Sequence, residues 1–138
     1  DTKNNNSEFK LQDKNKILRN SDLIAICISY NKNNYNFVNK KFFSKMKKNS
    51  IFVNTSRGEV VNENDLINAL KTKKIRYALL DVIKNEQKLN IKKNNLLEYA
   101  KKNSNLIISP HMAGLTIESE TKAFLIAAEN LFRHFRRI

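Results

Sequence analysis

Three short apolar runs in this 138-residue sequence are each followed by a side chain suited to acid–base or anion chemistry. These side chains are Arg57 after residues 51–56, Asp81 and Glu86 after residues 77–80, and His111 after residues 106–110. If the runs are parallel strands of one open sheet, a ligand binds beyond their carboxyl ends. A guanidinium, a carboxylate and an imidazole would then line one crevice around a single small molecule.

Each of these residues also has an ordinary structural interpretation. An arginine beside Gly58 is compatible with a turn and a structural ion pair. A single histidine after a strand, such as His111, is more often structural than catalytic, and Glu86 lies in a lysine-rich stretch where carboxylates are usually solvated. The chemistry is therefore indicated by the residues as a set and by none of them alone.

The elements that position this set follow from hydrophobic periodicity. Compact apolar runs predict strands over residues 23–28, 51–54, 75–81 and 106–109. Amphipathic spacing predicts helices over residues 13–19, 38–48, 62–71, 96–101 and 116–137, and Asn62 with Asp65 is typical of a capping box. The last helix is expected to face inward with Phe124, Ile126, Ala127, Leu131 and Phe135. This alternation predicts an α/β fold of the doubly wound class, a parallel sheet covered by helices on both faces.

Composition restricts the class of protein. The net charge of +13 raises the possibility of a nucleic-acid-binding module. The lysines are spread through nearly every segment without interleaved aromatic residues, so we favour a solvated surface instead. One cysteine and the lack of a bilayer-length apolar run favour a soluble, disulfide-free, cytoplasmic protein that binds neither nucleic acid nor membrane. Cys27 is interpreted as a small buried hydrophobic residue.

Three motifs together resemble the D-isomer-specific 2-hydroxyacid dehydrogenase family, which includes phosphoglycerate dehydrogenase-like enzymes. They are Asn-Thr-Ser-Arg-Gly at residues 54–58, Leu-Asp-Val at residues 80–82, and Pro-His-Met-Ala-Gly at residues 110–114. They occur in the order and at the spacing of that family. Two family glycines are replaced, by Asn49 and by Tyr77; asparagine tolerates the left-handed backbone conformation, whereas Tyr77 is expected to alter packing.

The resemblance implies catalytic roles for three residues. Arg57 matches the arginine that binds the substrate carboxylate, for which a planar guanidinium is better suited than lysine. His111 matches the proton donor, and an imidazole, with an ordinary pKa of about 6.5, can gain and lose a proton near neutral pH. Glu86 matches the carboxylate that orients this histidine.

The resemblance also implies NAD as the cofactor and no metal ion. Asp81 matches a residue that contacts the nicotinamide amide, although a structural cap is the alternative. Other residues are expected beside the nicotinamide, partly through their backbone: Ile28, Thr55, Ser56, Arg57, His111, Ala113 and Gly114. Asp1 stands where an acidic residue binds the ribose 2′-hydroxyl, which favours NAD over NADP.

The sequence has two glycines and no G-x-G-x-x-G phosphate loop. We therefore interpret residues 1–138 as the C-terminal part of an NAD-binding domain, a partial Rossmann-type sheet lacking its first two strands, with the substrate domain absent. In the order 3-2-1-4-5-6, residues 23–28 would be strand 3 and residues 51–54 strand 4, roughly 14 Å apart. Such a fragment is not expected to be stable or active alone.

The expected function is reversible hydride transfer between nicotinamide and a D-2-hydroxy acid or 2-keto acid, in a homodimeric oxidoreductase. Two alternatives stay open. One is a catalytically silent NAD(H)-binding regulator of the same family, which the joint presence of Arg57, Glu86 and His111 disfavours. The other, less favoured, is a basic nucleic-acid-binding module.

Overall fold

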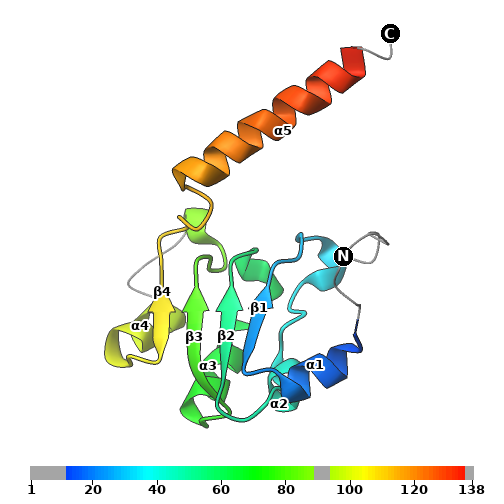
Figure 1. Cartoon of the computed structure of the whole chain (residues 1–138). Helices are drawn as coiled ribbons and strands as arrows, with labels where there is room; N and C mark the ends of the chain where they lie inside the picture. The colour runs from blue at the N-terminus through cyan, green and yellow to red at the C-terminus, as the bar shows by residue number, and fades with distance from the viewer. Residues whose placement is uncertain (1–11, 89–93, 136–138) are drawn as a thin grey trace.

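The computed structural model describes residues 12–88 and 94–135 (Figure 1). Its helices are α1 (Lys14–Asn20), α2 (Lys40–Lys45), α3 (Glu63–Lys71), α4 (Asn95–Lys102) and α5 (Ile117–Phe135). Its strands are β1 (Leu23–Ile26), β2 (Ser50–Asn54), β3 (Ile75–Leu80) and β4 (Leu106–Ile108). Three 3-10 turns, η1 (Lys32–Asn34), η2 (Gly58–Val60) and η3 (Glu86–Lys88), lie between them.

Asparagine side chains begin several of these helices. Asn39 caps α2, Asn94 caps α4, and the Asn62 side chain accepts the backbone N–H of Asp65 at 3.1 Å to cap α3. Only this half of the expected capping box is confirmed. The Asp65 carboxylate accepts the backbone N–H of Lys40 at 2.8 Å instead, so it ties α3 to the first turn of α2.

The α/β class with a parallel sheet is confirmed, but the expected gap between the first two strands is wrong. The four strands pair in sequence order, β1-β2-β3-β4, and every pairing is parallel. Leu23 pairs directly with Ile51, and Ile26 with Asn54. Direct pairing satisfies the backbone N–H and C=O groups along β2 that a gap of two strands would leave unpaired.

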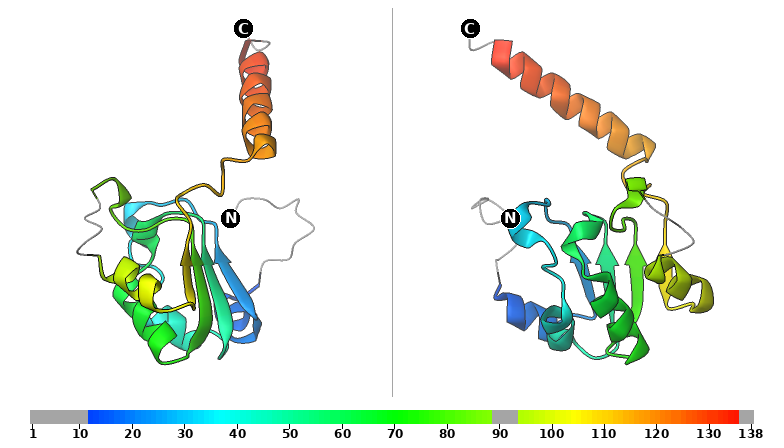
Figure 2. Two further views of the ribbon diagram at one scale, coloured as in Figure 1. Left: turned by 90° about the vertical axis from the view of Figure 1, so that its left-hand side faces the viewer. Right: turned by 180° about the vertical axis from the view of Figure 1, so that it is seen from behind.

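The hydrophobic core lies on one face of this sheet, under α2, α3 and α4 (Figure 2, left). Phe43 and Phe52 meet edge to face there at 5.3 Å between ring centroids, and Leu66 and Ala78 are fully buried. Helices were expected on both faces. In the described residues the other face carries no helix, and exposes apolar side chains including Leu23, Tyr77, Leu79 and Ile107.

The long helix α5 stands away from the sheet (Figures 1 and 2). Phe124, Ile126, Ala127 and Leu131 were expected to face inward, but all are exposed; Phe124 is 76 % exposed. The side chain of Phe135 lies outside the described residues. The periodicity predicted an apolar helical face correctly, but it could not say whether this chain supplies the surface that covers the face.

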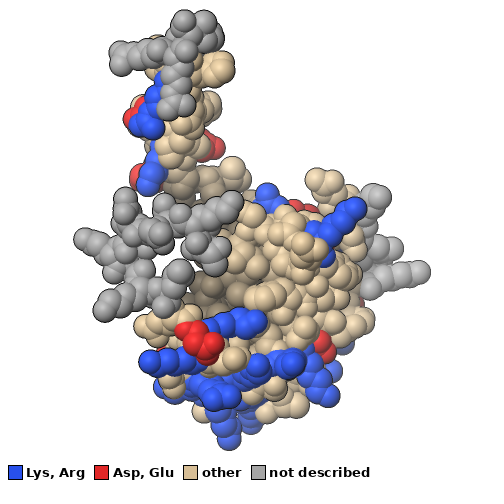
Figure 3. Space-filling view, turned by 90° about the vertical axis from the view of Figure 1, so that its right-hand side faces the viewer, with Lys and Arg blue, Asp and Glu red and all other residues tan. Residues whose placement is uncertain are grey.

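Lysine and arginine side chains gather over the α1 and α2 end of the domain, away from α5 (Figure 3). Part of this charge is neutralised locally, because Lys47 pairs with Asp22 at 2.6 Å. Asn49, at the position of a family glycine, has a φ of 65°. This is the left-handed conformation that asparagine was expected to tolerate there. None of the described helices is both long and apolar enough to span a bilayer.

Candidate functional site

The candidate residues follow β2, β3 and β4, and they lie at the end of the sheet where these parallel strands have their carboxyl termini. Asn54, the last residue of β2, is fully buried and organises the turn that follows. Its Oδ1 accepts the backbone N–H and the hydroxyl of Ser56 at 3.1 and 2.8 Å, and its Nδ2 donates to the carbonyl of Arg57 at 3.0 Å. No separate role was expected for Asn54, although an amide side chain at the end of an apolar strand is a signal for one, because it needs hydrogen-bond partners when buried.

Arg57 lies in a hollow shared with the end of β1. This hollow is lined by Cys27, Ile28, Ser29, Tyr30, Thr55, Ser56 and Arg57. The guanidinium folds back on its own turn, where Nη1 donates to the carbonyl of Ser56 at 2.7 Å. Cys27 was expected to be buried, but it is exposed, with its sulfur 3.8 Å from the Thr55 hydroxyl. Strand β1 ends at Ile26, one residue before it, so Cys27 belongs to the loop.

Asp81, directly after β3, is buried and holds the turn that carries His111. Its Oδ1 accepts the hydroxyl of Ser109 at 2.6 Å and the backbone N–H of Met112 at 2.9 Å, and its Oδ2 accepts the N–H of Ala113 at 2.9 Å. Burial opposes ionisation, but the bonds from Ser109, Ala113 and Met112, with His111 nearby, hold the pKa of this carboxyl below its usual value of 3.8. These contacts favour the structural cap among the two roles considered for Asp81.

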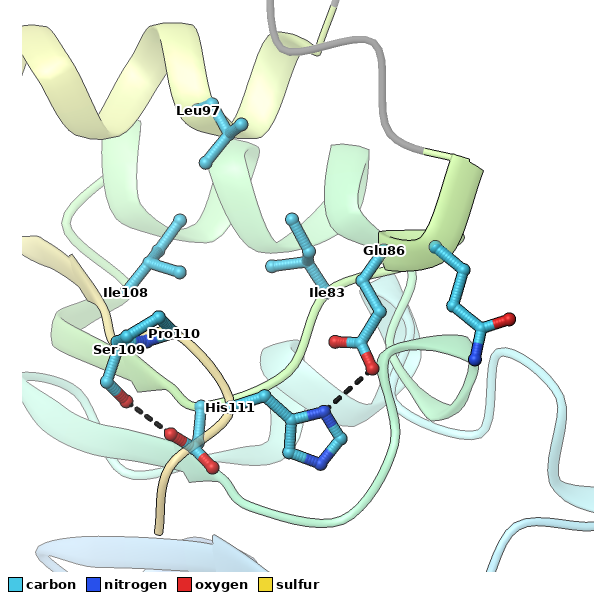
Figure 4. A pocket seen from close by; sticks show the side chains of 9 residues that line it. Ile83, Glu86, Leu97, Ile108, Ser109, Pro110 and His111 are labelled. Carbon is cyan, nitrogen blue, oxygen red and sulfur yellow. Dashed lines mark hydrogen bonds and ion pairs between the residues drawn. The ribbon is translucent and has the colours of Figure 1, made fainter. Parts of the chain in front are cut away.

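His111 and Glu86 form a direct pair. Nδ1 of His111 lies 2.7 Å from Oε1 of Glu86, and both side chains are partly exposed (Figure 4). This contact orients the imidazole and leaves Nε2 directed away from Glu86. His111 has a φ of 53°, a left-handed conformation that a non-glycine residue adopts at some energetic cost. The three hydrogen bonds to Asp81 stabilise the chain on both sides of that strained residue.

The hollow in front of this pair has an apolar wall. Ile83, Leu97 and Ile108 line it together with Asp81, Glu86 and His111 (Figure 4). Apolar surroundings strengthen the electrostatic interaction between an imidazole and a carboxylate. The arrangement therefore presents an oriented imidazole to a small molecule bound in this hollow.

The structure does not join the candidate residues into the one crevice that was expected. Arg57 and the Glu86–His111 pair line different hollows, and the described residues show no hydrogen bond between them. The two hollows open at the same edge of the sheet because their strands are parallel neighbours. Ala113 and Gly114 are exposed after His111, and Asp1 lies outside the described residues.

Comparison with known proteins defines the class. Residues 1–113 match the family described as "D-isomer specific 2-hydroxyacid dehydrogenase, NAD binding domain". The chain therefore belongs to the D-isomer-specific 2-hydroxyacid dehydrogenases, through their NAD-binding domain. This confirms the resemblance carried by the three motifs.

The similar curated proteins include reductases. A glyoxylate reductase of Thermofilum pendens is 36 % identical over 126 residues, covering 91 % of this chain and 35 % of the reductase. A human glyoxylate reductase/hydroxypyruvate reductase is 38 % identical over 116 residues, covering 84 % of this chain and 34 % of that protein. The chain thus spans about a third of the length of these relatives.

Solved structures of the same fold include two D-lactate dehydrogenases. The Lactobacillus jensenii enzyme with NAD+ has a TM-score of 0.71 at 29 % identity, covering 76 % of this chain and 34 % of the enzyme. The Aquifex aeolicus enzyme complexed with NAD and lactic acid has a TM-score of 0.71 at 25 % identity, covering 91 % of this chain and 40 % of the enzyme. These neighbours confirm the Rossmann-type α/β fold.

NAD is the cofactor of this domain family, and the described residues fit its nicotinamide end. The hollow beside Arg57 combines the exposed Ile28 with the hydroxyl of Thr55, whose 3.8 Å contact with the sulfur of Cys27 is a weak one. Oδ2 of Asp81 accepts one hydrogen bond, so it keeps room for a second donor. For the diphosphate of the cofactor this sequence offers no glycine-rich loop.

Proposed function

We propose that the whole protein reversibly reduces a 2-keto acid to a D-2-hydroxy acid with NADH, and that residues 1–138 are the C-terminal part of its NAD-binding domain. The observation that carries the proposal is the 2.7 Å contact of Glu86 with His111, beyond the carboxyl ends of β3 and β4, while Arg57 follows the neighbouring strand β2. NAD supplies or accepts the hydride at the carbon that bears the substrate oxygen.

The residues of this chain would handle the proton and the charge. Arg57 would bind the substrate carboxylate through two parallel N–H···O bonds, after its guanidinium leaves the carbonyl of Ser56. His111 would donate a proton from Nε2 to the keto oxygen during reduction, and take it back during oxidation. Glu86 would accept a hydrogen bond from the Nδ1–H of His111 and so stabilise the imidazolium. Ile28, Thr55 and Ser56 would hold the nicotinamide ring, with Ala113 and Gly114 beside it.

The substrate proposal rests on family membership and on the charge of Arg57, so it extends to 2-keto acids as a class. Glyoxylate, hydroxypyruvate, pyruvate and phosphohydroxypyruvate are the compounds to test. In the same proposal the protein is a cytoplasmic homodimer. The uncovered apolar sheet face and the exposed α5 support an assembly in which other protein surface covers them.

The deciding experiment follows NADH oxidation by the whole purified protein with each of these acids. His111→Ala should lower kcat by about 10²–10⁴-fold, the usual contribution of general acid–base catalysis, while NADH binding is retained. His134→Ala, on α5, is the matched control and should leave kcat unchanged.

Arg57→Lys tests the carboxylate anchor. Loss of bidentate geometry should raise KM for the keto acid by about 10- to 100-fold. Arg76→Lys, where the guanidinium lies 5.3 Å above the ring of Tyr77, is its control. A protein that binds NADH, turns over none of these acids and is unchanged by His111→Ala would instead be the silent NAD(H)-binding regulator.

A further inference from the structure

The segment that begins with Arg57 packs against the turn that carries Glu86. Gly58 lies so close to this turn that a Cβ on it would stand 2.1 Å from the carbonyl carbon of Ile83 and 2.3 Å from the nitrogen of Lys84. Five residues further on, Oε1 of Glu63 accepts the backbone N–H of Lys84 at 2.8 Å. Glu59 makes a longer contact of 3.4 Å to the N–H of Asn85.

This turn contains one residue in the left-handed conformation, which asparagine tolerates better than most residues. Asn85, immediately before Glu86, has a φ of 52°. The preceding Lys84 is fixed at both ends: its backbone is bound to Glu63, and its Nζ donates to Asn36 at 2.5 Å and lies 4.6 Å from the ring centroid of Tyr35. Contacts from the segment of Gly58, Glu59 and Glu63 therefore fix residues 83–85, which directly precede Glu86.

Glu63 is the unusual member of this arrangement. It is the first residue of α3, it is partly buried, and it does not line the hollow of His111 or that of Arg57. Burial raises the pKa of its carboxyl, against the N–H and the charge of Lys84, and Glu59 adds to the increase. Placing a carboxylate here has an energetic cost that its bond to Lys84 offsets.

We propose that Glu63 is a positioning residue: by accepting the backbone N–H of Lys84, it fixes the turn that presents Glu86 to Nδ1 of His111. This inference rests on the proposed function and adds to it a residue outside both hollows. Arg57 begins the same segment as Glu63, but it makes no direct bond to the Glu86–His111 pair within the described residues.

The test compares two substitutions in the whole protein. Glu63→Gln keeps a side-chain oxygen that can accept the N–H of Lys84, whereas Glu63→Ala removes it. Glu98→Ala is the control, because Glu98 is an exposed residue of α4 whose ion pair is a 3.7 Å contact with Lys102. One measurement is kcat and KM for keto-acid reduction. The other is the ¹⁵N NMR spectrum of the His111 ring, which distinguishes Nδ1–H from Nε2–H.

Glu63→Ala should lower kcat at least tenfold with KM changed less than threefold, and should decrease the Nδ1–H form of His111. Glu63→Gln and Glu98→Ala should stay within threefold of the unsubstituted protein by both measures. A folded Glu63→Ala protein with an unchanged His111 tautomer would overturn the proposal, and so would a Glu63→Gln protein as impaired as Glu63→Ala.

If Glu63→Ala does not fold, amide hydrogen exchange in the unsubstituted protein provides the test. The Lys84 N–H should exchange at least 100-fold more slowly than in an unstructured peptide, and exchange at the peptide rate would overturn the proposal. The NMR result also separates this inference from the proposed function. If no keto acid is reduced, the His111 tautomer in Glu63→Ala still decides the role of Glu63.

Discussion

Asp81 shows how one carboxylate can prepare a site without carrying out its chemistry. It accepts three hydrogen bonds from the β4–α5 connection, two of them from the backbone immediately after His111. The strained φ of His111 is therefore maintained from the end of β3. The sequence predicted that Asp81 follows a strand and precedes Glu86. It did not predict the three hydrogen-bond donors of Asp81, because they lie 28 or more residues away in the sequence.

We expect Asp81→Asn to destabilise the protein in a pH-dependent way. The pKa of Asp81 is lowered in the folded state, so its contribution is fully present above its usual value of 3.8 and is lost as the pH falls through the folded value. At pH 7 the free energy of unfolding should fall by about 1.5–3 kcal/mol, because an amide donor would face an N–H group. Urea denaturation at neutral and acidic pH measures this.

The difference between Asp81→Asn and the unsubstituted protein should shrink in acid. Asp22→Asn is the control: Asp22 pairs with Lys47, but its side chain is 87 % exposed, so its removal should matter little. An Asp81→Asn protein that is equally destabilised at both pH values would show that ionisation of Asp81 does not drive the effect.

Between elements, the decisive contact is that of turn η2 with the turn before η3. Sequence patterns placed these segments after neighbouring strands, and the strand types and parallel direction were predicted correctly. They did not indicate that Gly58 packs directly on Ile83, because backbone approach depends on how β2 and β3 align. The contact determines where Arg57 lies relative to Glu86.

Gly58→Ala should therefore be strongly unfavourable. The new Cβ would meet backbone atoms of Ile83 and Lys84 that cannot rotate away, so we expect a loss of about 1–3 kcal/mol in the free energy of unfolding. Gly114→Ala is a close control, because no atom lies within 4 Å of its added Cβ. Thermal denaturation of both variants measures the difference; equal stability would contradict the packing described.

At the scale of the described molecule, the largest apolar side chains on the surface lie on one sheet face and on α5. The sheet face exposes Leu23, Tyr77, Leu79 and Ile107, and α5 exposes Phe124 and Leu131 among others. An α/β sheet is normally covered on both faces. The exposed surface supports the expectation that this chain requires further protein surface for stability.

The isolated 138-residue chain is expected to unfold without a sharp transition, to bind an apolar dye and to show no measurable affinity for NAD. The physical reasons are the uncovered sheet face and the lack of a glycine-rich phosphate loop. Circular dichroism during urea denaturation, with calorimetric NAD titration, tests both statements. Cooperative two-state unfolding together with NAD binding would contradict them.

Local order along the chain was enough to predict the α/β class, the four strands, the family motifs and the cofactor, because apolar periodicity and short motifs are written in consecutive residues. Pairing of β1 with β2, the uncovered sheet face and the exposure of α5 depended on contacts between distant segments. The same is true at the site, where His111 and Glu86 lie 25 residues apart in the sequence. The parallel pairing of β3 with β4 is what places Nδ1 of His111 beside the carboxylate of Glu86.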